Sequence, residues 1–144
     1  MARLHASRGA GRCRRCASRD HESFLYAIAD ALHDEYQAIV EAGFDVQIDD
    51  AYIASEYDGM VPPGSLDDCR RWADAGVAAL NHALRGILAE RVRYHVCWGS
   101  RDGPHSNDVA LRDIVDLLLK VNAAVIRSRW PTPGTNMSGR LGRP

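Results

Sequence analysis

Apolar residues follow a helical spacing in the first third of the chain and an alternating spacing directly after it. Between about residues 20 and 42, apolar side chains recur at three- and four-residue steps, which predicts an amphipathic helix. These positions are Leu25, Ile28, Leu32, Tyr36 and Ile39. Gly43 then supplies a left-handed helix end. Phe44, Val46 and Ile48 alternate with polar residues and predict a strand that is at least half buried.

The same succession of helix and strand repeats twice. Ser65 and Asp68 have the spacing of a capping box, which predicts a second helix that starts there. Its predicted buried stripe is Cys69, Trp72, Gly76, Leu80, Leu84 and Ile87, and His82 lies off this stripe as a solvated residue. A strand is predicted from Arg93 to Trp98. Asn107 or Asp108 would cap a third helix, and residues 122–126 predict the start of a third strand. The predicted inward residues of that third helix are Leu111, Ile114, Val115, Leu118 and Val121.

Strands that alternate with helices of more than ten residues predict an α/β fold with a parallel sheet of about three βα units. The pattern alone fits either an open doubly wound sheet or a piece of a (β/α)8 barrel. A complete barrel needs about 250 residues, and the chain has 144. Neither G-x-G-x-x-G nor a Walker motif is present, which argues against the nucleotide-binding version of an open sheet.

Charge divides the chain into three parts. Residues 1–19 hold six arginines, no acid and no apolar period, and predict a disordered Arg-rich tail. The folded domain is predicted over residues 20–126, and residues 127–144 predict a second disordered tail. The net charge of −1 argues against nucleic acid or an anionic membrane as the partner. No apolar run approaches the roughly 20 residues of a membrane helix.

Two residues of the second strand are candidate metal ligands. Because side chains alternate along a strand, His95 and Cys97 point to the same side. An imidazole and a thiolate together suit a borderline-soft cation such as zinc. The alternative is a buried strand that carries one His and one Cys by chance. The four cysteines do not form a disulfide framework, so a reducing cytoplasm is expected.

Several short motifs, taken in order, resemble the barrel of the cobalamin-independent methionine synthase family and its shorter methionine-synthase-like members. The resemblance covers roughly residues 20–124. Its pieces are Glu35-Tyr36, Ala42-Gly43-Phe44, Gln47-Ile48-Asp49, His95-Val96-Cys97-Trp98-Gly99, Gly103-Pro104-His105 and Leu111-Arg112-Asp113-Ile114. The resemblance favours the barrel over the open sheet, so the expected fold is a fragment of a (β/α)8 TIM barrel.

The resemblance implies a zinc-dependent transfer of a methyl group from a methyl-folate to a thiol such as homocysteine, in methionine biosynthesis. Coordination by zinc matters because a free thiol, with a pKa of about 8.5, is mostly protonated at neutral pH. His95 and Cys97 are carried over as zinc ligands. Asp49, with Gln47 beside it, is carried over as the group that binds the amino group of the substrate. Asp102 and His105 would support the site, or belong to a solvated turn.

The chain also departs from the family pattern. A glutamate that follows the third strand and a cysteine on the last strand are further zinc ligands in the family, and neither has a counterpart here. Two protein ligands do not make a catalytic zinc site, so a truncated protein that is inactive alone is expected. Alternatives are a non-catalytic remnant or interaction module that self-associates through unpaired sheet edges, and transfer to another thiol such as coenzyme M. A uroporphyrinogen-decarboxylase-like barrel without metal is disfavoured by His95 and Cys97.

A frameshift near Ile126 would explain the missing glutamate. Codons for residues 128–139 can be chosen so that an adjacent frame reads Phe-Glu-Val-Ala-Asn-Pro-Arg-His-Glu-His-Glu-Trp, which begins with the Phe-Glu of the family. Trp130 and Met137 constrain the choice because each has a single codon. The Arg-rich start of the chain would have a similar origin. Resequencing of the locus is expected to find this reading in the adjacent frame, and an early stop codon there would rule the frameshift out.

Overall fold

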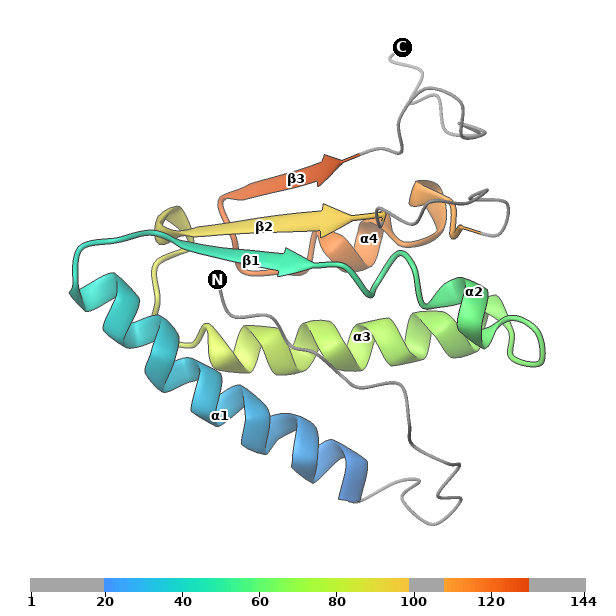
Figure 1. Ribbon diagram of the computed structural model, residues 1–144, viewed down its shortest axis with the longest axis horizontal. Coiled ribbons are helices and arrows are strands. Elements are labelled where there is room, and N and C mark those ends of the chain that lie inside the picture. The colour runs from blue at the N-terminus through green and yellow to red at the C-terminus, as the bar shows by residue number, and fades with distance from the viewer. Residues whose placement is uncertain (1–19, 99–107, 130–144) are drawn as a thin grey trace.

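Three short strands lie side by side in chain order, and all of them run in the same direction. The computed structural model describes residues 20–98 and 108–129. The three-stranded sheet has the order β1-β2-β3, and both pairs are parallel. The helices lie along one side of this sheet (Figure 1). The elements are α1 (Asp20–Glu41), β1 (Val46–Asp50), α2 (Tyr57–Met60), α3 (Leu66–Ala83), β2 (Val92–Cys97), α4 (Val115–Leu118) and β3 (Val125–Arg129). The predicted α/β class with a parallel sheet is confirmed.

The first helix and strand form close to where the pattern predicts them. α1 ends at Glu41, and Gly43 has a φ of 89°, the left-handed conformation that glycine adopts at little cost. Phe44 was predicted as an inward strand residue, and this is wrong: its side chain is 68% exposed and the strand begins at Val46. A distant residue holds this segment, since Arg91 donates to the carbonyl oxygen of Phe44 at 2.8 Å and to the carboxylate of Asp45 at 2.7 Å.

The second helix has the predicted cap but a different buried stripe. Ser65 and Asp68 form the reciprocal hydrogen bonds of a capping box. Trp72 and Gly76, predicted to be inward, are exposed. The buried stripe continues instead through smaller residues, and α3 ends at Ala83, before Ile87. The residues of this stripe are Cys69, Ala73, Val77 and Leu84, with Leu80 partly buried.

Small residues also set the contact between the two long helices. Ala29 of α1 packs with Ala79 and Ala83 of α3 in a buried cluster of its own. Alanine side chains let helix backbones approach closely, whereas a larger residue at these positions would push the helices apart. The larger core lies between α3, the segment that contains α4, and the covered face of the sheet. Its fully buried members with the largest side chains are Tyr94, Leu84, Ile114, Val92 and Val96.

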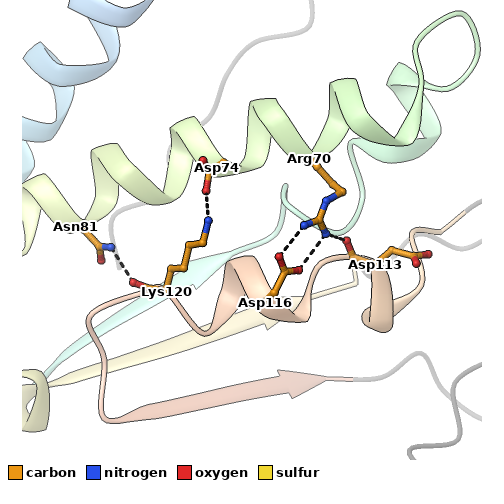
Figure 2. Close-up of polar contacts among 6 residues, drawn as sticks. All are labelled: Arg70, Asp74, Asn81, Asp113, Asp116 and Lys120. Atoms are coloured by element: carbon orange, nitrogen blue, oxygen red, sulfur yellow. Dashed lines mark hydrogen bonds and ion pairs between the residues drawn. The ribbon is translucent and has the colours of Figure 1, made fainter.

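The third predicted helix forms only in part, and three of its predicted inward residues, Ile114, Leu118 and Val121, are buried. Only a turn of 3-10 helix at Leu111–Asp113 and the four residues of α4 are helical, and Val115 is only partly buried. Contacts with α3 hold this segment instead (Figure 2). Arg70 donates to both carboxylate oxygens of Asp116, at 3.0 and 2.6 Å, and to the carbonyl oxygen of Asp113. The hydrogen bond from Arg70 holds the pKa of the Asp116 carboxyl below its usual value.

Further polar contacts continue along the same side of α3. Lys120 donates to the carboxylate of Asp74 at 2.7 Å, and the Asn81 side chain donates to the carbonyl oxygen of Lys120 at 2.8 Å (Figure 2). The Asn81 side chain also accepts a hydrogen bond from the backbone N–H of Asn122 at 2.8 Å. Long-range contacts therefore satisfy backbone groups that a continuous third helix would have satisfied internally.

The third strand starts within the predicted range but runs on into the predicted tail. It spans Val125–Arg129, so its start agrees with the prediction of residues 122–126, whereas the disordered tail predicted from residue 127 is wrong for its first residues. Arg127 and Ser128 therefore belong to the sheet, in register with His95 and Val96.

Among the described residues, none of the helices has the length and the apolar character that crossing a membrane requires.

Candidate functional site

One face of the sheet is covered by helices and the other is left open by the described elements. Along β2, Val92, Tyr94 and Val96 are fully buried, whereas the residues between them are exposed or half-buried. Since side chains alternate along each strand, the residues of β1 and β3 that are in register with the exposed residues of β2 lie on the same open face. The open face is formed by Gln47, Asp49, Arg93, His95, Cys97, Val125 and Arg127. The four residues predicted for the site, Gln47, Asp49, His95 and Cys97, therefore share one face.

Asp49 and His95 lie next to each other on this face. They are register partners in adjacent strands, and Nε2 of His95 is 3.8 Å from Oδ1 of Asp49. This distance is too long for a hydrogen bond. The Asp49 side chain is 68% exposed and that of His95 is 23% exposed, so both are accessible to a ligand.

Two arginines join the predicted residues on the open face. Arg93 is the register partner of Gln47, and Arg127 is the register partner of His95 on the other side from Asp49. Both arginines are exposed. The alternation that pairs His95 with Cys97 also places Arg93 with them, so this residue was within reach of sequence reasoning. Arg127 was not, because the pattern assigned it to a tail.

The donor atoms suit zinc, but the described residues do not supply a complete site. Cys97 is half-buried and follows His95 on the same face. In residues 20–98 and 108–129 there is no group of three or more His, Cys, Asp or Glu side chains placed to hold a metal ion. A catalytic zinc site has three protein ligands and one open position. Asp102 and His105, the predicted supporting residues, lie outside the described residues.

A polar contact on the covered face was not predicted. Asp50 follows Asp49 and points to the opposite side, where its Oδ2 accepts a hydrogen bond of 2.6 Å from the hydroxyl of Tyr94. Its Oδ1 accepts from the backbone N–H groups of Tyr52 and Ile53, at 2.8 and 3.0 Å. Burial, and then the charge of Asp50, raises the pKa of Tyr94 far above its usual value. Asp50 therefore fixes the loop after β1 and has no access to the open face.

The two described cysteines lie in different environments. Cys69 is fully buried in α3, as the sequence predicted for a small core residue. Burial raises the pKa of the Cys69 thiol, and the charge of Glu56 adds to this effect. Only the thiolate binds a metal well, so Cys69 is a poor ligand. Of the two, Cys97 is the one that can reach a ligand on the open face.

His82 connects two helices and is not the solvated residue that the sequence predicted. Its Nε2 lies 2.8 Å from Oδ1 of Asp30 in α1, and its ring meets the ring of Tyr26 edge-on at 5.0 Å. Arg85 approaches the same carboxylate oxygen at 3.1 Å. The hydrogen bond from His82 lowers the pKa of the Asp30 carboxyl. These contacts join α1 to α3 at the surface, away from the open face.

The fold and the site together define a small α/β protein whose parallel sheet presents a carboxylate, an imidazole, a thiol and guanidinium groups on one open face. Comparison of the chain with models of protein families, with curated proteins and with solved structures finds no match.

Proposed function

We propose that the chain is a part of a zinc-dependent methyltransferase barrel of the cobalamin-independent methionine synthase type. The observation that carries the proposal is that Asp49, His95 and Cys97 share the open face on two adjacent parallel strands. Strands in chain order with helices on one side are also what consecutive βα units of a (β/α)8 barrel would have. In such a barrel the open face would line the interior.

Each residue of the face has a proposed role. His95 and Cys97 would ligate zinc, while Asp49 and Gln47 would bind the amino group of an amino-acid thiol such as homocysteine. The reaction of a complete barrel would transfer a methyl group from a methyl-folate to that thiol. The described residues hold too few ligands for a catalytic zinc site, so this chain alone is expected to lack the reaction. Coenzyme M is an alternative thiol acceptor, because its thiol would bind the same zinc ion. The expected location is the reducing cytoplasm.

The first test is zinc binding by the purified chain. We expect weak binding that Cys97→Ser abolishes, because serine oxygen is a much poorer zinc ligand than a thiolate. Cys69→Ser is the matched control and should retain zinc, since Cys69 is buried in the helix layer. Binding would be measured by equilibrium dialysis with metal analysis. Equal zinc retention by the two variants would contradict the proposal.

The second candidate function is a non-catalytic interaction module. The observation that favours it is the open sheet face together with strands β1 and β3, which have no further strand beside them among the described residues. Such edges and faces associate readily with other chains. If the purified chain binds no zinc but forms a defined complex through this face, that result would support the interaction module over the methyltransferase proposal.

A further inference from the structure

We propose that two copies of the chain pack with their open faces together, about a twofold axis parallel to β2. In this dimer, His95 and Cys97 of both copies would together form the four-ligand set that one chain lacks. The metal part of this inference rests on the proposed zinc ligands. The dimer itself rests on the arrangement of charge on the face.

An all-parallel sheet needs cover on both faces. Such sheets occur almost entirely in folds that bury each side. Here the described helices cover one side, where Val92, Tyr94 and Val96 are fully buried. On the other side Val125 is 43% exposed, and His95 and Cys97 are only half-buried. A second sheet packed at the usual spacing of about 10 Å would cover these residues.

The charges on the open face are complementary to those of a second copy. Asp49, His95 and Arg127 stand in one row across β1, β2 and β3, with the negative residue on one side and the positive residue on the other. A twofold axis along β2 exchanges the β1 and β3 sides. Asp49 then faces Arg127 of the partner subunit, and the contact occurs twice. A twofold axis perpendicular to the strands would instead set Asp49 against Asp49 of the partner subunit, so charge selects the axis.

The same axis passes over the two candidate ligands. His95 and Cys97 lie on β2, the central strand, so each would meet its equivalent across the axis. Two imidazoles and two thiolates form one of the tetrahedral sets that structural zinc sites use. The face would therefore be a closed metal site between copies, with one zinc ion for two chains.

Arg93 is the residue that opposes this dimer. It also lies on β2, one row before His95, and would face Arg93 of the partner subunit. Like charges in such a position are unfavourable. Replacement of this exposed residue in Arg93→Gln should therefore tighten the dimer by a few fold, which is opposite to the usual effect of removing a surface residue.

Charge reversal with mixing tests the dimer directly. Asp49→Arg alone places two arginine pairs across the interface, and Arg127→Asp alone places two aspartate pairs. Each variant should dimerise about tenfold or more weakly than the parent chain. An equimolar mixture should form a heterodimer with both ion pairs restored, within about threefold of the parent affinity. Sedimentation equilibrium in a chelator measures all four samples.

The mixture distinguishes an ion pair between two chains from a contact within one chain. Mixing can restore the first but not the second. Recovery in the mixture also shows that both variants are folded. A mixture that associates no better than the single variants would overturn the dimer, as would single variants that dimerise like the parent.

Zinc stoichiometry separates this inference from the proposed function. One zinc ion for two chains, lost in Cys97→Ser, supports the shared site. One zinc ion for each monomeric chain overturns the dimer and leaves the methyltransferase proposal intact. Charge-dependent dimers that bind no zinc overturn the zinc ligands and the shared metal site, while the dimer surface stands.

Discussion

Leu84→Ala is expected to lower the free energy of unfolding by about 2–5 kcal/mol, the range for a large aliphatic residue removed from a close-packed core. Leu84 is fully buried at the end of α3, in the cluster that contains Tyr94, Val92 and Ile114. The cluster draws its side chains from several elements, so removal of the Leu84 side chain leaves a cavity within it. Urea unfolding followed by circular dichroism measures the effect.

Leu88→Ala is the matched control. Leu88 lies four positions later and its side chain is 69% exposed, so its removal should change the free energy of unfolding by no more than about 0.5 kcal/mol. Similar losses in the two variants would show that Leu84 does not lie in a packed core.

The parts of the fold that were predicted correctly depend on residues close together in the sequence. The capping box at Ser65 needs only a partner three residues away, and it forms as predicted. α1 has a long stripe and a glycine end, so its limits are clear. The alternation of the strand predicted from Arg93 to Trp98, observed as Val92–Cys97, correctly put His95 and Cys97 on one face. Local chemistry was sufficient in each case.

The wrong predictions depend on contacts between distant segments. The pattern favoured Trp72 as a large inward residue, but the helix turns by about 100° per residue, and Ala73 is the residue that meets the core. Which side of α3 meets the sheet depends on the tertiary contacts, and hydrophobicity alone does not encode it. The third helix was predicted from its apolar period, yet contacts from Arg70 and Asn81 of α3 hold that segment in another form.

The sequence predicted which residues of the candidate site share a face, but it did not predict how close together they lie. Asp49, Gln47, His95 and Cys97 follow from alternation and from the motif resemblance, and they lie on one face. Their closeness depends on the register of β1 against β2, which the sequence does not state. The hydrogen bond from Tyr94 to Asp50 and the pair of His82 with Asp30 join residues 44 and 52 positions apart. No local pattern marks either partner.

Tyr94→Phe is expected to lower the free energy of unfolding at neutral pH by about 1.5–3 kcal/mol, the range for a hydrogen bond to a charged group. The Tyr94 hydroxyl is buried and donates to Asp50 at 2.6 Å. Phenylalanine keeps the ring in the core but leaves one oxygen of the Asp50 carboxylate without this donor. Tyr57→Phe is the matched control, because Tyr57 is only partly buried against the same core, and it should stay within about 0.5 kcal/mol of the parent.

The difference between Tyr94→Phe and the parent should then disappear at alkaline pH. In the folded chain, burial is the main cause that raises the pKa of Tyr94, and the charge of Asp50 raises it further. In the unfolded chain the hydroxyl loses its proton near pH 10, while the folded chain keeps it. The parent therefore loses about 1.4 kcal/mol of stability per pH unit above that point, and Tyr94→Phe avoids this particular loss. The two stabilities should meet between about pH 11 and 12. Urea unfolding of both proteins from pH 7 to 11.5 measures the convergence, and a constant difference across this range would show that Tyr94 ionises equally easily in the folded and unfolded chains.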